Sequence, residues 1–75
     1  MKTNLYAAEK GRSLTVTYVP SIGLLHNMGL RAGSQVIVQS KYIWGGPVLL
    51  RVEDAYSIAL GKDIAVQIGV SYVGH

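Results

Sequence analysis

Glycines placed between short apolar segments constrain the fold of this chain more than any other feature. Residues 28–36 read Met-Gly-Leu-Arg-Ala-Gly-Ser-Gln-Val, and residues 44–48 read Trp-Gly-Gly-Pro-Val. Glycine enters left-handed backbone conformations without a steric penalty, so it stops helices and closes tight turns. The pattern predicts a short helix stopped by Gly29, a turn through Gly33, and two strands joined by a tight loop at residues 45–46.

Five segments alternate apolar and polar side chains with the period of two that is typical of half-buried strands. Pro20 ends the first segment, and Pro47 stands at the start of the third, where it need not donate to the ladder. The segments are residues 13–18, 35–42, 47–52, 56–60 and 66–70. On this alternation Tyr18 and Val66 also face inward. The predicted core is Leu14, Val16, Val36, Val38, Val48, Leu50, Val52, Ile58, Leu60, Ile68 and Val70.

A short helix is predicted over residues 22–28, between the first two strands. Ser21 is the expected N-cap. Gly29 suits the left-handed position after the helix, and Leu30 would make the hydrophobic contact that often follows such a stop. Residues 61–65 form a one-turn connector before the last strand. The apolar helix face is expected to contain Leu24, Leu25 and Met28.

The chain has 75 residues, which is enough for one domain. Short strands at close spacing predict an all-β fold, a small closed barrel, because closure would remove the edges that so apolar a sheet could not leave open. The absence of cysteine excludes disulfides, thiolate zinc sites and cysteine nucleophiles. No segment has the run of apolar residues needed for a signal peptide or a membrane span, so we expect a cytoplasmic protein without membrane insertion.

Three segments together resemble the FeoA family, small cytosolic proteins of bacterial ferrous-iron uptake. They are residues 24–33 (LLHNMGLRAG), 45–48 (GGPV) and 58–70 (IALGKDIAVQIGV), and the resemblance covers roughly residues 11–70. It implies a single domain over 1–75 with a small five-stranded SH3-like barrel and one short helix. It also implies a non-enzymatic accessory protein without a cofactor. The implied partner is the cytosolic GTP-binding part of the iron transporter.

An iron-linked family makes a metal site the first chemistry to consider. A structural site needs three or four converging ligands. His26 and His75 are weak candidates, because neither has a partner at ligand spacing, and the acidic residues do not supply one. We therefore expect no metal site, although a transition-metal-ion-binding or sensing module remains an alternative. The acidic residues considered are Glu9, Glu53, Asp54 and Asp63.

Catalysis has no motif in this chain. Its serines lack a recognisable histidine and carboxylate arrangement, and the neighbouring Glu53 and Asp54 would point to opposite faces of a strand. A small barrel that binds single-stranded nucleic acid is a third alternative, since such barrels combine aromatic with basic residues. Lys41, Trp44 and Arg51 have that character, but so few cations would release few counterions. We expect no nucleic-acid partner.

Partner binding is the function that the residues favour most. On strict alternation Ile37 and Leu49 point outward from neighbouring strands, and Trp44 stands at the tip of their hairpin with Lys41 and Arg51 nearby. Outward apolar residues with a tryptophan are typical of an interface anchor. Two alternatives remain: a bulge that turns Ile37 inward, or self-association through the same surface. A further alternative packs the Trp44 indole back against the barrel.

Overall fold

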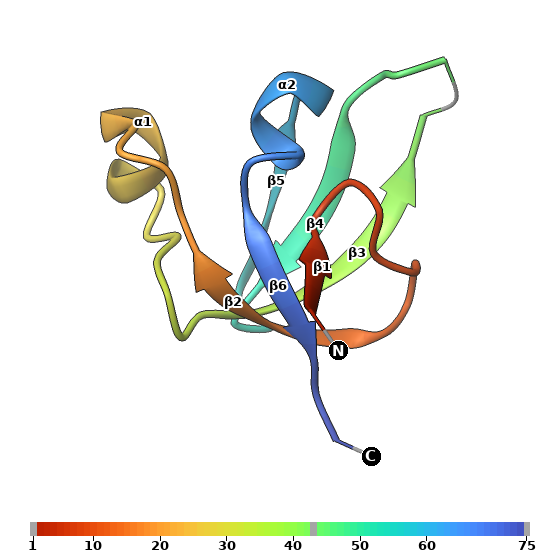
Figure 1. Ribbon diagram of the computed structural model, residues 1–75, viewed down its shortest axis with the longest axis horizontal. Helices are drawn as coiled ribbons and strands as arrows, with labels where there is room; N and C mark the ends of the chain where they lie inside the picture. Colours follow the sequence, from red (N-terminus) through yellow and green to blue (C-terminus); the bar gives the residue numbers. More distant parts are fainter. Residues whose placement is uncertain (1, 43, 75) are drawn as a thin grey trace.

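The computed structural model describes residues 2–42 and 44–74 (Figure 1). Within them, six strands form one antiparallel sheet in the order β1-β6-β2-β3-β4-β5. The two helices are short, α1 (Gly23–Asn27) and α2 (Lys62–Ala65). The strands are β1 (Lys2–Asn4), β2 (Ser13–Tyr18), β3 (Gln35–Lys41), β4 (Val48–Val52), β5 (Tyr56–Leu60) and β6 (Gly69–Tyr72).

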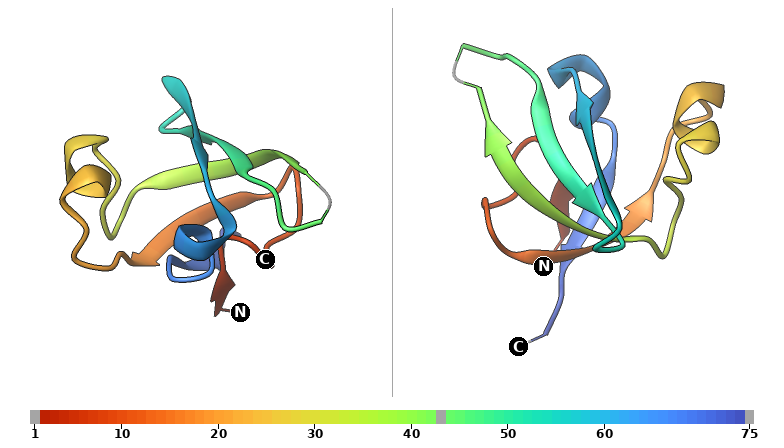
Figure 2. Two further views of the ribbon diagram at one scale, coloured as in Figure 1. Left: turned by 90° about the horizontal axis from the view of Figure 1, so that it is seen from above. Right: turned by 180° about the vertical axis from the view of Figure 1, so that it is seen from behind.

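The sheet curls so that β1 and β6 lie in front of β4 and β5 (Figure 1). Among the described residues, the ladder leaves β1 and β5 as the two edges, so the barrel is not closed by hydrogen bonds. The molecule measures 29 × 26 × 22 Å. In all three views α1 stands at one end of the molecule and the β3–β4 loop at the opposite end (Figures 1 and 2).

Strand β1 was not predicted. Its three residues are polar and too few to show an alternation, and they are held by pairing with β6, where Lys2 faces Ser71 and Asn4 faces Gly69. The chain then turns into the core, where Leu5 and Ala8 are fully buried. The N-terminal segment thus contributes an additional strand and part of the core.

The last strand begins later than predicted. The predicted one-turn connector is helix α2, in which the Ala65 N–H donates to the Gly61 carbonyl at 2.9 Å. This turn leaves Val66 exposed instead of inward, while Ile68 and Val70 are buried as predicted. Strand β6 extends to Tyr72, in what was expected to be a tail.

Helix α1 starts without the predicted cap. Ile22, not Ser21, takes the N-cap position, and it makes no side-chain capping bond. The helix is one residue shorter than predicted at each end. Only one side of so short a helix reaches the core, so Leu25 is buried whereas Leu24 is 55% exposed.

The end of α1 matches the prediction. Gly29 has a φ of 79°. The Leu30 N–H donates to the Leu25 carbonyl at 3.1 Å, and the Gly29 N–H donates to the His26 carbonyl at 3.0 Å. This is the Schellman arrangement, and the buried Leu25 and Leu30 supply its hydrophobic contact.

A tyrosine joins α1 to the sheet. The Tyr56 hydroxyl at the start of β5 donates a hydrogen bond to the Met28 carbonyl. A Cβ at Gly29 would lie 2.9 Å from that hydroxyl oxygen. Glycine is therefore needed at position 29 both for its backbone angle and for this close approach.

Two shifts of register modify the predicted alternation. One lies between Val16 and Tyr18 and turns Tyr18 outward, where it is 59% exposed instead of inward-facing. The other lies between Val38 and Ser40 in β3. A bulge of this kind adds one unpaired residue and re-aims the side chains that follow it.

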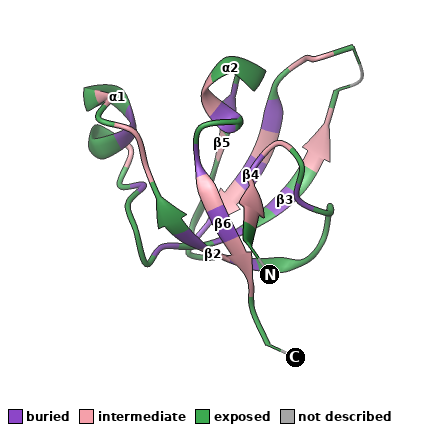
Figure 3. Cartoon of the chain, in the orientation of Figure 1, coloured by how far each residue is buried: buried purple, intermediate pink, exposed green. Residues whose placement is uncertain are grey.

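The core lies between the curled walls of the sheet (Figure 3). Every predicted core residue is buried except Ile58, which is partly buried and packs against the others. The buried hydrophobic residues not in the predicted core are Leu5, Ala8, Leu25, Leu30 and Ala65.

Candidate functional site

The outer face of β3 and β4 carries part of the predicted partner surface. Ile37 lies directly opposite Arg51, and Leu49 lies opposite Ser40 on one side and Ala59 on the other. The bulge comes after Ile37, so this residue keeps its outward direction and is 37% exposed. Leu49 is half-buried.

A polar bridge divides this face. The Ser57 hydroxyl of β5 donates to the Gln39 side-chain oxygen of β3 at 2.8 Å. Since β4 lies between those two strands, the register places the bridge between Leu49 and Arg51. Ile37 and Leu49 therefore do not form one continuous apolar patch.

Arg51 is engaged by the turn between β4 and β5. Its Nε lies 3.3 Å from the Asp54 carboxylate, and its terminal nitrogen donates to the Asp54 carbonyl at 3.1 Å. Glu53 and Asp54 both take left-handed backbone angles there, and the Glu53 carboxylate accepts a hydrogen bond from the Gln35 N–H. Both carboxylates have structural roles in this turn, although so exposed an ion pair contributes little stability.

The bulge in β3 moves Lys41 to the other face of the sheet. Lys41 lies opposite the buried Val48, on the side of the core, and its Nζ is 5.9 Å from the centre of the Tyr6 ring. The Nζ of Lys62 lies 5.2 Å from the same ring. The structure thus does not bring Lys41 together with Ile37 and Leu49. The cluster with Tyr6 was not predicted, because Tyr6 lies in a segment with no strand or helix signal.

Trp44 is 95% exposed, at the tip of the β3–β4 hairpin. In the structure the indole therefore does not pack against the barrel, in contrast to the alternative considered from the sequence. Its φ is 66°, and Gly45 beside it has a φ of 77°. A left-handed angle at Trp44 was not predicted, since the turn was expected to place its positive angles on glycines.

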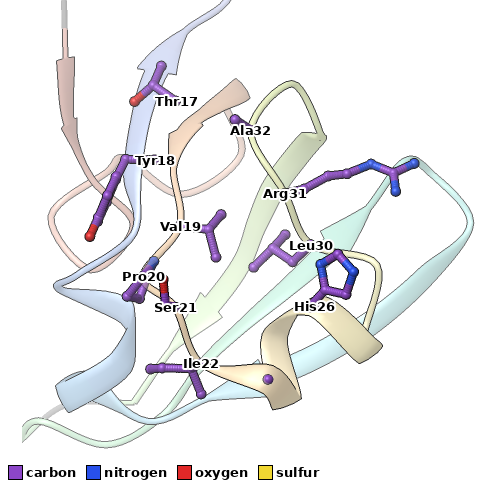
Figure 4. Close-up of a pocket in the computed structure, with 11 residues that line it drawn as sticks. Thr17, Tyr18, Val19, Pro20, Ser21, Ile22, His26, Leu30, Arg31 and Ala32 are labelled. Carbon is purple, nitrogen blue, oxygen red and sulfur yellow. The ribbon is translucent and has the colours of Figure 1, made fainter.

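A groove at the opposite end of the molecule was not predicted as a site. It has a volume of about 620 Å³ and lies between the end of β2 with its linker to α1 and the residues that follow α1 (Figure 4). Its only sequence signal is Pro20, which ends the ladder of β2. The lining residues are Thr17, Tyr18, Val19, Pro20, Ser21, Ile22, Gly23, His26, Leu30, Arg31 and Ala32.

Of the two histidines considered as metal ligands, His26 lies exposed in the lining of this groove. His75 lies outside the described residues. Within residues 2–42 and 44–74, no three histidine or acidic side chains gather where they could hold a metal ion. The expectation of no metal site stays a prediction.

Comparison with known protein families shows which family the chain belongs to. The sequence profile of the FeoA domain matches residues 3–72. The chain belongs to the FeoA family. Members of this family are associated with ferrous-iron uptake and are generally non-enzymatic accessory proteins. Within the described residues, no helix is long and apolar enough to cross a bilayer.

Solved structures confirm the SH3-like fold class. An iron uptake regulatory protein, FeoA, superimposes with a TM-score of 0.85 at 24% identity, covering 97% of this chain and 99% of its own. A FeoA-like protein from Clostridium acetobutylicum gives 0.81 at 24% identity, covering 99% of this chain and 90% of its own. A manganese-dependent transcriptional repressor gives 0.85 at 19% identity, but over only 42% of its length. A search among curated proteins found no match.

Proposed function

We propose that this FeoA domain is a non-enzymatic accessory protein that works in the cytoplasm and binds the cytosolic GTP-binding part of a ferrous-iron transporter. Membership of the FeoA family supports the link to iron uptake. If this protein bound the two nucleotide states of the transporter domain with different affinities, its binding would shift the equilibrium between those states and so regulate the transporter. A ligand shifts such an equilibrium only by the difference between its affinities for the two states.

Trp44 is the observation that carries this proposal. Its indole makes little contact with the rest of the protein, so it adds little to folding. Its left-handed backbone angle adds a local cost, on the order of 1–3 kcal/mol for a non-glycine residue. Burial against a partner explains why a large aromatic residue stands there, since tryptophan is a frequent binding hot spot.

The half-exposed Ile37 and the partly buried Leu49 support the same hairpin as the docking element. They lie on the outer face of its strands, on either side of the polar bridge from Ser57 to Gln39. Arg51, held by Asp54, would then stand at the rim of the docking surface. Lys41 lies on the opposite face of the sheet, near Tyr6, and so would not share that surface.

The test uses the purified cytosolic GTP-binding domain of the transporter. Trp44→Ala should weaken its binding by about 2 kcal/mol, which is about thirtyfold in affinity. Leu24→Ala, which removes an exposed apolar side chain at the other end of the molecule, is the matched control and should leave affinity unchanged. Sedimentation of both variants measures self-association by the same surface.

Three outcomes are informative. Loss of binding in Trp44→Ala alone supports the proposal. A folded Trp44→Ala protein that binds the transporter domain as well as the parent does would contradict it. If Trp44→Ala abolishes self-association instead of transporter binding, the tip is a contact between copies of this chain.

A further inference from the structure

The side of the β3–β4 hairpin that faces the core carries a second inference, which goes beyond docking through Trp44 and the outer face. Two lysines meet there beside the ring of Tyr6. They are Lys41 from the end of β3 and Lys62 from the start of α2, and together they form the lysine pair. We propose that the lysine pair binds an acidic protein segment, one in which two or more carboxylates stand close together.

One tyrosine ring positions both ammonium groups. The Nζ of Lys62 lies 5.2 Å from the centre of the Tyr6 ring and that of Lys41 lies 5.9 Å from it, distances at which a ring attracts a cation. Tyr6 is itself partly buried and packs against the core. The Lys62 stem also lies against the hairpin loop, because its Cδ would be 3.4 Å from a Cβ added at Gly45. Three segments that are far apart in the sequence therefore hold the pair in one place.

The fold brings these two like charges together at a cost. The bulge between Val38 and Ser40 turns Lys41 to the side of the sheet on which Lys62 lies. Like charges that share one place repel each other, and this repulsion opposes the compact state. Within the described residues, neither lysine of the pair forms an ion pair that would offset the repulsion. An approaching anion would offset it.

The chain's own carboxylates do not supply that anion. All four acidic side chains are placed elsewhere: two pair with arginines, one accepts a hydrogen bond from a backbone N–H, and one turns back toward the first residues of α2. In this order they are Glu9 and Asp54, Glu53, and Asp63. The counter-charge for the lysine pair therefore has to come from another molecule.

Neighbouring protein carboxylates are the counter-charge that suits this pair best. The two ammonium groups come from different segments, so each can take one carboxylate, and the net charge of +3 favours the approach of an acidic partner. Nucleic-acid sites instead follow the backbone with several cations and stack bases on aromatic rings. Here the described cluster offers two cations, and both of them already lie near its single ring.

The experiment is an NMR titration of the ¹⁵N-labelled full chain with three probes. They are the acidic peptide Ac-Glu-Glu-Glu-Glu-NH₂, its neutral twin Ac-Gln-Gln-Gln-Gln-NH₂, and inorganic phosphate. Because so short a peptide is expected to bind with a millimolar Kd, concentrations reach about 10 mM. The acidic peptide should shift the amide signals of Tyr6, Lys41 and Lys62, and the other two probes should bind at least about fivefold more weakly.

Matched charge variants test the lysine pair. The double variant Lys41→Gln, Lys62→Gln should weaken the acidic peptide at least about fivefold, because two ion pairs are lost. The control Lys2→Gln, Arg31→Gln removes the same net charge from exposed positions outside the cluster and should leave the affinity within about twofold. Lys41→Arg, Lys62→Arg keeps both charges and should keep binding. Each variant is first shown to keep the parent pattern of amide signals.

Four results would overturn the proposal. The signals of the lysine pair do not move, the neutral twin binds as well as the acidic peptide, or the control variant loses as much affinity as the lysine variant. Phosphate that binds as tightly as the acidic peptide is the fourth, because the pair would then take any small anion. The titration uses no transporter domain, so its result is independent of whether Trp44 docks there.

Discussion

The two ends of the molecule offer contrasting surfaces. At the α1 end, Leu25 and Leu30 are buried and the surface is hollowed into a groove. At the other end, Trp44 projects from the β3–β4 tip with its side chain almost entirely exposed. Both ends are built around a left-handed residue, Gly29 in one and Trp44 in the other.

The difference shows how the same backbone angle can serve two purposes. At Gly29 the angle turns the chain so that Leu30 packs into the core, and the residue type removes the steric cost. At Trp44 the angle presents a large side chain to solvent, and because the residue is not glycine the steric cost of the left-handed angle remains. Substitutions at the α1 end should therefore change stability, whereas substitutions at the tip should change binding.

The largest effect is expected from Leu25→Ala. It removes a fully buried side chain from the α1 end and should lower the free energy of unfolding by about 2–5 kcal/mol. The neighbouring Leu24→Ala removes the same atoms from an exposed position, so its free energy of unfolding should stay within about 0.5 kcal/mol of the parent value. Urea unfolding measures both. Equal losses in the two variants would mean that α1 does not pack as described.

Gly29→Ala is expected to have the next largest effect. It should lower the free energy of unfolding by about 2–3 kcal/mol, because alanine is strained at the left-handed angle and its Cβ would crowd the Tyr56 hydroxyl. Gly11→Ala is the control, because Gly11 has a similar φ of 85° but nothing within 4 Å of an added Cβ. It should lose only about 1 kcal/mol. Tyr56→Phe removes the hydroxyl, so in that background the loss of unfolding free energy in Gly29→Ala should come closer to the loss in Gly11→Ala. An unchanged difference between the two losses would argue against a close approach of the added Cβ to the Tyr56 hydroxyl.

Trp44 substitutions should scarcely alter stability. Trp44→Ala should leave the free energy of unfolding within about 0.5 kcal/mol of the parent. Trp44→Gly, which relieves the left-handed angle, should be no less stable than Trp44→Ala in thermal melts. A loss of several kcal/mol in either variant would show that the indole packs against the barrel and would break the contrast between the two ends.

Iron should have the smallest effect. His26 is the histidine at the α1 end, and within the described residues it has no cluster of further ligands. Anaerobic calorimetry with iron(II) is expected to give no stoichiometric heat of binding. A one-to-one site of submicromolar affinity that persists in a variant lacking His75 would favour the metal-sensing alternative.

The strands in the middle of the chain could be predicted because each has one buried face. Val36, Val38, Val48 and Leu50 alternate as expected, and Gly29 ends α1 as its residue type requires. Strand β1 could not be predicted from its own sequence, because its three residues become a strand only by pairing with β6, at the other end of the chain.

The candidate sites depended on features that alternation does not encode. The position of Arg51 depends on its contacts with Asp54. The position of Lys41 depends on a bulge that no residue type in β3 predicts. The groove arises from two segments that diverge, and Val19 and Leu30 face each other only once α1 is folded. Trp44 was predicted to be exposed because it stands at the tip of a hairpin, and the structure leaves it 95% exposed.

The bulge in β3 also affects how this chain should be compared with its relatives. Up to Val38 the even-numbered residues of the strand face the core, and beyond it the odd-numbered Lys41 does. A relative that lacked one residue here would therefore offer a different side chain to solvent without a single substitution. Residues of the hairpin should be matched by the face they occupy, counted from their partners on β4, because a single inserted or deleted codon changes the chemistry of the tip more than most replacements would.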